Sequence, residues 1–218
     1  MQKPCIMKKA LKRTVRQMTT VWIYTGKRVL DEETRKRLEK ALPAPVFARR
    51  KRVGSSDRDA SLLAYTALLR LAEERWPGVS QKLCFTDRGK PCFHTENAPY
   101  CSISHTDGAM AVALSDRPVG VDVQAVTRIR EAVVSRVFTA KERAAIAFAA
   151  PGEGERLFTR IWAQKEAALK KSGLGLYGLR QIPPEPGVYT LMEADGWVAA
   201  VCAEETAVIV ADPVNTLL

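Results

Sequence analysis

The feature that most restricts the fold is a short alternating segment, followed about forty residues later by a helical pattern. Residues 119–124 read Val-Gly-Val-Asp-Val-Gln, so branched apolar side chains occupy every second position. That period predicts a strand with one buried face, and it places Asp122 and Gln124 together on the other face. Residues 158–171 carry apolar side chains at helical spacing, with Glu166 and Lys170 four positions apart on one side. We expect two acidic side chains, one on each element, to hold a divalent cation and the phosphate that it neutralises. Mg²⁺ suits this arrangement, because it binds one or two carboxylates and completes its shell with water and substrate oxygens.

Length and composition are those of an ordinary globular protein. The 218 residues are enough for one domain or two small ones. No apolar run reaches the roughly 18 residues of a membrane helix, and no secretory signal is visible. The five cysteines are odd in number and unclustered, so we expect free thiols and a cytoplasmic protein.

The net charge of +10 raises the alternative of a basic nucleic-acid-binding protein. Six of the positive charges lie within residues 1–17, which contain no acidic residue, and the remaining surplus is modest. We expect residues 1–17 to be a dispensable or disordered basic leader. No recognised nucleic-acid motif supports the alternative, which predicts steeply salt-dependent binding to DNA or RNA.

The rest of the chain alternates strand and helix patterns. A strand over 21–24 precedes a helix capped by Asp31 and ended at 42–45, and a second helix spans about 57–75. Short strands follow up to residue 124, and Thr139 with Glu142 forms a capping box that opens a further helix. After the helix over 158–171, the segments 189–192, 197–201 and 207–210 read as antiparallel strands. Strand, helix and strands thus occur twice, before and after about Pro118.

For three smaller patterns, an ordinary structural explanation competes with a functional one. The run Arg49-Arg50-Lys51-Arg52 is either a solvated face or a phosphate clamp. Ser104 and His105 are adjacent on a strand and so point to opposite faces, which argues against a nucleophile and its base. The cysteines and histidines lack the spacing of a zinc site.

Five motifs that occur together in one order are more specific than any one of them alone. They are Gly89-Lys90-Pro91, Ile103-Ser104-His105, Gly120-Val121-Asp122, Phe138-Thr139-x-x-Glu142 and Trp162-x-x-Lys165-Glu166-x-x-x-Lys170. From about Trp22 to the C-terminus, the series resembles the 4′-phosphopantetheinyl transferases of the type that activates surfactin synthetase (Sfp-type). The resemblance implies an α+β fold of two similar α/β subdomains, residues 18–117 and 118–218, in a pseudo-two-fold arrangement. The active site is then expected in the cleft between them.

The resemblance also implies the reaction. Such an enzyme transfers the 4′-phosphopantetheine group of coenzyme A to a serine hydroxyl of an acyl or peptidyl carrier protein, needs Mg²⁺, and releases adenosine 3′,5′-bisphosphate (holo-acyl-carrier-protein synthase activity). By similarity, Asp122, Gln124 and Glu166 surround the metal, and Asp122, Glu166 and Lys170 are catalytic, with Glu166 or a water that it positions as the general base. The residues assigned to coenzyme A are Arg49, Arg50, Arg52, Arg58, Lys90, Pro91, Ser104, His105, Lys165 and Lys170. For Lys165, a structural role is the alternative to coenzyme A binding.

Two positions depart from the family pattern. Many members carry a third carboxylate where this chain has Gln124, which predicts weaker metal binding without coenzyme A. An arginine commonly stands where this chain has Ala60, so Arg58 is the expected substitute. The carrier is expected to dock on the basic and apolar segment from Arg128 to Phe138. The equally weighted alternative is that this segment is an ordinary solvent-exposed amphipathic stretch. We expect a monomer with no membrane and no specific nucleic-acid partner, and the remaining alternative is a homologue that binds coenzyme A or the carrier without catalysis.

Overall fold

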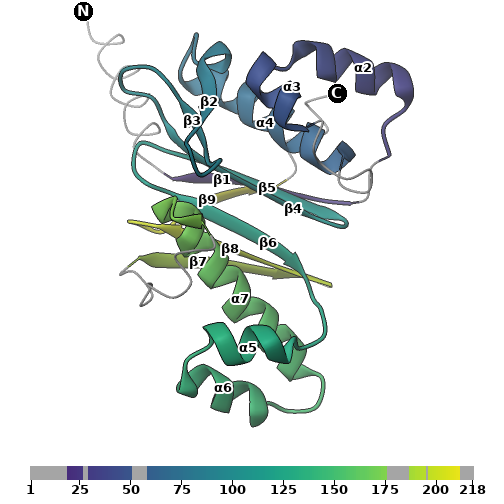
Figure 1. Cartoon of the computed structure of the whole chain (residues 1–218), viewed down its shortest axis with the longest axis vertical. Coiled ribbons are helices and arrows are strands. Elements are labelled where there is room, and N and C mark those ends of the chain that lie inside the picture. Colours follow the sequence, from purple (N-terminus) through teal and green to yellow (C-terminus); the bar gives the residue numbers. More distant parts are fainter. Residues whose placement is uncertain (1–18, 27–28, 51–57, 176–186, 195, 212–218) are drawn as a thin grey trace, which may run out of the picture.

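Two β-sheets lie face to face, with helices covering their outer faces (Figure 1). The computed structural model describes residues 19–26, 29–50, 58–175, 187–194 and 196–211. The four-stranded sheet has the order β4-β5-β1-β9 and the three-stranded sheet the order β6-β8-β7. A separate hairpin of β2 and β3 carries the turn that contains Lys90. The fold is therefore mixed α+β, as expected.

The elements follow one another along the chain in two similar series. The first contains β1 (Thr20–Thr25), α2 (Glu32–Ala41), α3 (Ala44–Arg50), α4 (Arg58–Arg75), β2 (Leu83–Phe85), β3 (Pro91–Phe93), β4 (Tyr100–Thr106) and β5 (Ala109–Ser115). The second contains β6 (Gly120–Ala125), α5 (Glu131–Val137), α6 (Ala140–Ala147), α7 (Glu153–Ser172), β7 (Val188–Ala194), β8 (Trp197–Ala203) and β9 (Val208–Ala211).

Small and branched side chains fill the space between the two sheets. Val21 and Ile23 of β1, with alternate alanines of β5, pack against Val121 and Val123 of β6 and alternate residues of β8. The outer face of the four-stranded sheet packs on α4, and that of the three-stranded sheet packs on α7. Because β5 and β8 are covered on both faces, they are apolar at nearly every position.

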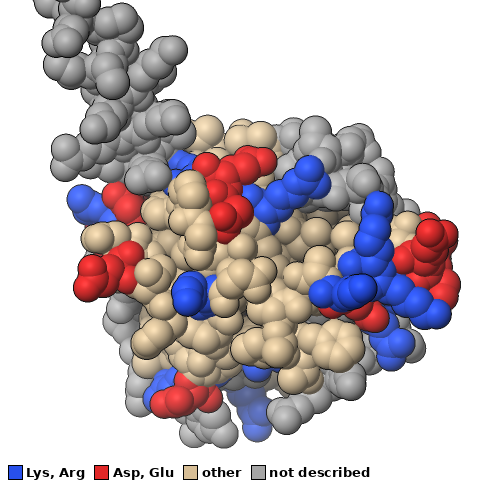
Figure 2. Space-filling view, turned by 90° about the horizontal axis from the view of Figure 1, so that it is seen from above, with Lys and Arg blue, Asp and Glu red and all other residues tan. Residues whose placement is uncertain are grey.

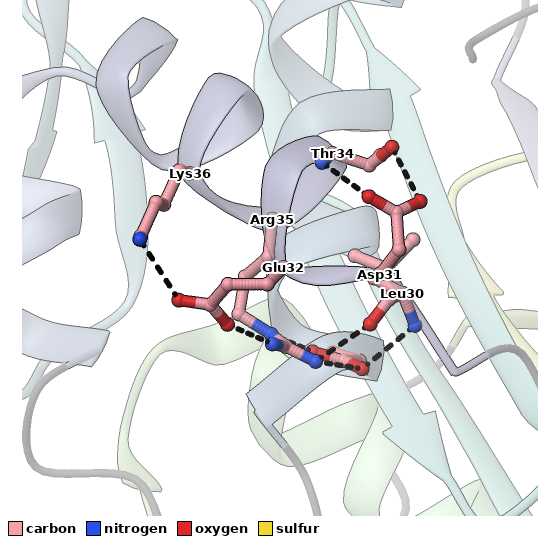
Figure 3. A network of polar contacts seen from close by, with 7 residues as sticks. Leu30, Asp31, Glu32, Thr34, Arg35 and Lys36 are labelled. Atoms are coloured by element: carbon pink, nitrogen blue, oxygen red, sulfur yellow. Dashed lines mark hydrogen bonds and ion pairs between the residues drawn. The ribbon is translucent and has the colours of Figure 1, made fainter.

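Figure 3 shows how the first turn of α2 is fixed to α4. The Asp31 carboxylate caps α2 by accepting from the Thr34 backbone N–H at 2.7 Å. Arg35 then reaches Asp59 of α4, with its Nε 2.9 Å from Oδ1, and Asp59 also accepts from the Leu30 N–H at 3.0 Å. These contacts hold the beginning of α4, and the cap that the sequence predicts at Asp31 is confirmed.

Two elements differ from the sequence-based expectation. Residues 44–50 form the helix α3, although the neighbouring prolines indicate only a helix end; Pro45 lies in the first turn, where its missing N–H costs nothing. The strand expected at 207–210 is present as β9, but its expected antiparallel pairing is wrong, because β9 pairs in parallel with β1. It thereby joins the four-stranded sheet rather than β7 and β8.

Several expectations fall on other parts of the chain. The proposed leader, residues 1–17, and Arg52 lie outside the described residues, and for Arg50 only the backbone is described. Within the described residues, no helix is long and apolar enough to cross a membrane. Cys84, Cys92, Cys101 and Cys202 are free thiols, as expected.

Candidate active site

The close packing of α7 on β6 creates the site. A Cβ atom built on Gly120 would lie 1.9 Å from the Ala167 carbonyl oxygen and 2.3 Å from the Lys171 backbone nitrogen. Only glycine fits where the helix backbone rests on the strand. Alanines at 163, 167 and 168 keep the rest of this contact short. As a result, the side chain of Asp122, two residues along β6, faces the α7 residues Glu166 and Lys170.

Asp122 is almost completely buried, with 1% exposure, and both of its carboxylate oxygens are hydrogen-bonded. Its Oδ1 accepts from Lys170 Nζ at 2.6 Å and from Ser104 Oγ at 2.8 Å. Its Oδ2 accepts from the amide of Gln124 at 2.8 Å. A buried carboxylate requires this degree of compensation, and the ammonium of Lys170 supplies the opposite charge.

Glu166 is in a different electrostatic state. It lies one helical turn before Lys170 and is half-buried. Burial raises the pKa of its carboxyl, the negative charge of Asp122 raises it further, and the charges of Lys170 and Arg130 oppose these effects. Asp122 and Glu166 are therefore close enough for their charges to interact. Together, the two carboxylates carry more negative charge than the ammonium of Lys170 alone offsets.

These residues fit a magnesium ion. Two carboxylates with a side-chain amide beside them are oxygen donors of the kind that Mg²⁺ binds, and the remaining positions suit water or phosphate. The described residues contain no cluster of three or more His, Cys, Asp or Glu side chains, so the site has few ligands of its own. A cation that binds here needs further oxygens from a substrate.

A cavity of about 300 Å³ opens beside this cluster. Glu166 and Lys170 form one wall, and the turn that contains Lys90 and Pro91 forms another, together with Arg49 and Tyr65. A second cavity, of about 850 Å³, lies against the same turn. Both cavities are lined by Arg88, Lys90, Pro91 and Gly173.

Lys90 ties the turn to the end of α7. Its Nζ donates to the carbonyl of Lys171 at 2.9 Å and to that of Val119 at 3.2 Å. Burial lowers the pKa of this ammonium. Lys90 therefore joins the β2–β3 hairpin to both β6 and α7, and its side chain is already occupied by backbone carbonyls.

The other assigned residues divide into two groups. Ser104 joins the Asp122 cluster, and Arg49 lines the smaller cavity with its guanidinium carbon 4.9 Å from the Phe85 ring centre. Lys165 instead pairs with Glu142 at 3.0 Å and lies over the Phe138 ring, where it supports the packing of α6 on α7. Arg58 begins α4 and is exposed, and it lines neither cavity. His105 alternates with Ser104 on β4, so it points to the other face of that strand.

Sequence reasoning missed two contributions. Ser102 and Thr106 accept hydrogen bonds from backbone N–H groups of β6. The sequence pattern that could have indicated this is the hydroxyl side chain at every second position of the strand, at 102, 104 and 106. Arg130 lies near Glu166, and its guanidinium carbon is 5.8 Å from the ring centre of Phe158 and 5.5 Å from that of Trp162. No sequence pattern indicates that contact, because Arg130 precedes α5 and the two rings lie far along the chain in α7.

Comparisons with known proteins agree with this geometry. A family model described as the 4′-phosphopantetheinyl transferase superfamily matches residues 118–190, which run from just before β6 into β7. The 4′-phosphopantetheinyl transferase psf-1 of Bacillus pumilus is 26% identical over 68% of this chain and 67% of its own length. The 4′-phosphopantetheinyl transferase AcpT of Salmonella typhi is 32% identical over 53% of this chain and 60% of its own length. For the 4′-phosphopantetheinyl transferase Sfp of Bacillus subtilis, the identity is 27% over 40% of this chain and 39% of its own length. The matched part of the chain thus spans between about two fifths and two thirds of these relatives.

Proposed function

We propose that this chain, which belongs to the 4′-phosphopantetheinyl transferase superfamily, transfers the 4′-phosphopantetheine group of coenzyme A to a serine hydroxyl of an acyl or peptidyl carrier protein. The observation that carries the proposal is the meeting of Asp122, Glu166 and Lys170 beside a cavity. Two carboxylates and an ammonium are the groups that a diphosphate and its cation need.

Each of these residues has a role in the proposed reaction. The serine oxygen of the carrier attacks the phosphorus next to the pantetheine, and the bond from that phosphorus to the leaving adenosine 3′,5′-bisphosphate breaks. Glu166, or a water that it holds, takes the serine proton, and a carboxyl whose pKa is raised is a stronger base than an ordinary one. Lys170 offers its ammonium to the diphosphate, which then shares Lys170 with Asp122.

Mg²⁺ would be held by Asp122 and Glu166, with Gln124 as a neighbouring oxygen donor. When bound, it offsets negative charge on the diphosphate and orients the leaving group. The coenzyme A contacts expected at Arg49, Lys90, Pro91 and His105 remain proposals, whereas the hydrogen bonds of Ser104 are all made within the protein. The contacts expected at Arg50, Arg52 and Arg58 also remain proposals, whereas Lys165 has the structural role that its contact with Glu142 supports.

We also propose that the two halves, 18–117 and 118–218, are related by a pseudo-two-fold axis, with the active site between them. The strand orders support this idea. Among the three strands of β4-β5-β1, and likewise among those of β6-β8-β7, the strand that comes first along the chain (β1 or β6) pairs with the third (β5 or β8) and not with the second. Each half also has one long helix, α4 or α7, on the outer face of its sheet.

The experiment is holo-carrier formation measured by intact mass spectrometry. Purified protein is incubated with coenzyme A, Mg²⁺ and a panel of acyl and peptidyl carrier proteins, and each carrier is examined for the mass of one phosphopantetheine group. We expect modification of at least one carrier, and losses of roughly 100-fold or more for Asp122→Ala and Glu166→Ala. Glu155→Gln, an exposed change on the same helix, is the control. Undiminished transfer by either alanine variant would refute the site assignment.

The same preparation separates the alternatives. A homologue without catalysis would bind coenzyme A in calorimetry and leave every carrier unmodified. A nucleic-acid-binding protein would bind DNA or RNA with steep salt dependence. On the face over α2, α3 and α4, Figure 2 shows basic and acidic side chains interspersed rather than one continuous basic field, which gives that alternative no support there.

A further inference from the structure

The edge of the three-stranded sheet nearest the site is covered by hydroxyl groups. Strand β6 pairs with β8 along one side only, so alternate N–H groups of β6 point away from that partner. Val121 N–H donates to Ser102 Oγ at 3.0 Å, Val123 N–H to Ser104 Oγ at 3.2 Å, and Ala125 N–H to Thr106 Oγ1 at 3.4 Å. Three alternate N–H groups of β6 therefore donate to three alternate side chains of β4.

The position of β4 explains why side chains make this contact. The backbone of β4 pairs with β5 in the four-stranded sheet, and its hydroxyl-bearing residues stand opposite Ala113, Ala111 and Ala109. They therefore lie on the face that meets the other sheet. Ser102 and Ser104 are 2% and 6% exposed, so β6 has little access to water there. Without these hydroxyls, buried N–H groups would be left unpaired.

The hydrogen-bonding capacity of Ser104 is fully used within the protein. Its hydroxyl donates to Asp122 Oδ1 at 2.8 Å and accepts from Lys170 Nζ at 2.9 Å as well as from Val123 N–H. A hydroxyl has one hydrogen to donate and two lone pairs. Ser104 thus touches the strand that carries Asp122, the carboxylate itself and the ammonium beside it.

We propose that Ser102, Ser104 and Thr106 form a hydroxyl ladder that fixes β6 against β4, and that Ser104 is a positioning residue that orients Asp122 and Lys170 before substrate binds. This role differs from contact with a coenzyme A phosphate, since a hydroxyl that donates to Asp122 has no second hydrogen for a phosphate oxygen. The catalytic half of the inference rests on the proposed function, whereas the ladder itself does not.

Amide hydrogen exchange followed by NMR on metal-free, coenzyme-free protein tests the ladder. Ser102→Ala is expected to speed exchange of the Val121 N–H, and Thr106→Val that of Ala125, each roughly 5- to 10-fold, as for loss of one hydrogen bond. Thr106→Ser keeps the hydroxyl and should restore slow exchange. Ser135→Ala, in which an exposed hydroxyl on α5 is removed, should change none of these rates. Unchanged exchange of Val121 and Ala125 in the two disrupting variants would overturn the ladder.

Steady-state kinetics of Ser104→Ala tests the positioning role. Loss of orientation predicts a kcat reduced roughly 10-fold or more with the KM for coenzyme A within about twofold, whereas loss of a phosphate contact predicts a raised KM with kcat retained. The second result would overturn the positioning role and leave the ladder standing. If Ser104→Ala does not fold, the kinetics of Thr106→Val and its Thr106→Ser rescue decide the same question, with loss of kcat and recovery supporting positioning through β6. A wild-type protein that modifies no carrier would count against the proposed function, and hydrogen exchange would still decide the ladder.

Discussion

Asp122 and Glu166 have the same functional group but opposite surroundings. Asp122 is buried and paired with Lys170, and Ser104 and Gln124 each donate a further hydrogen bond to it. The surroundings of Glu166 disfavour its ionised form, because burial and the charge of Asp122 both raise the pKa of its carboxyl. The site thus holds one carboxylate that three hydrogen bonds compensate and one carboxyl whose ionised form is disfavoured, and the second has most to gain from a cation.

This difference predicts the effect of Glu166→Gln on stability. A carboxyl whose pKa is higher in the folded than in the unfolded protein lowers stability as pH rises through that interval, and its full penalty applies above the folded pKa. In EDTA at about pH 7.5, we therefore expect Glu166→Gln to melt at a higher temperature than the wild type, by roughly 2–4 °C for each kcal/mol gained. The gain should shrink as pH falls toward about 4. Calorimetry against pH measures it, with Glu155→Gln as control; a gain that persists at low pH would assign it to another cause.

Gln124 sets the charge of the site. Gln124→Glu adds a third carboxylate next to Asp122, and cation affinity rises with the number of charged ligands. We expect roughly tenfold tighter binding of Mg²⁺ in the absence of coenzyme A, and lower stability in EDTA because like charges then adjoin. Isothermal calorimetry of the metal alone measures the first effect. Gln164→Glu on α7 is the comparison, and equal metal affinity in the wild type and Gln124→Glu would show that position 124 lies outside the metal's reach.

Local periodicity was enough to pair the residues within each element. Alternation in β6 predicts that Asp122 and Gln124 share a face, and helical spacing predicts that Glu166 and Lys170 do, and both are confirmed. The link from Ser104 to Asp122 escaped prediction because it joins two sheets through side chains. Of the arginines assigned to coenzyme A, Arg49 and Arg50 end α3, Arg58 begins α4, and Arg52 lies outside the described residues, so no single strand or helix period relates them.

At the level of elements, the site depends on how closely α7 approaches β6. Gly120 permits that approach, and no other residue fits beside the Ala167 carbonyl. The sequence indicated a strand and a helix in this order, but nothing local to either pattern specifies their separation. The helix α3 was missed, and the strand β9 was predicted with the wrong pairing, because prolines and short apolar runs do not identify a partner.

Gly120→Ala should therefore damage the protein more than an ordinary glycine substitution. The added methyl group would meet helix backbone, which cannot rotate away, so we expect a loss of about 3 kcal/mol or more and a large fall in transferase activity. Chemical denaturation measures the first and holo-carrier formation the second. Gly154→Ala is the matched control: it lies in α7 with its nearest contact, a flexible Ile129 methyl, at 3.4 Å, and should be neutral or stabilising. Similar effects of the two changes would contradict the close-packing argument.

For the whole molecule, the two halves share one of their cores. Within the described residues, Val21, Ile23 and the β5 alanines pack in one cluster with the second sheet, and β9 supplies the outer partner of β1. The two parts of the chain therefore depend on each other for burial of this core.

This shared core predicts a single unfolding transition. Residues 19–117 and 118–211, expressed separately, should each lack a stable fold, because each would expose an apolar sheet face. Mixing the two fragments should restore amide dispersion in NMR spectra. Coincident melting of the intact protein by fluorescence and circular dichroism would agree, whereas a well-dispersed spectrum from either fragment alone would show that the halves are independent.

The pairing of β9 with β1 has a consequence for synthesis on the ribosome. Strand β1 is among the first of the described strands to be translated and β9 is the last, yet they are neighbours. Throughout elongation, the nascent chain carries β1 with one side unclaimed, a surface open to chaperones or to a second nascent copy. The four-stranded sheet is completed only after β9 has left the exit tunnel.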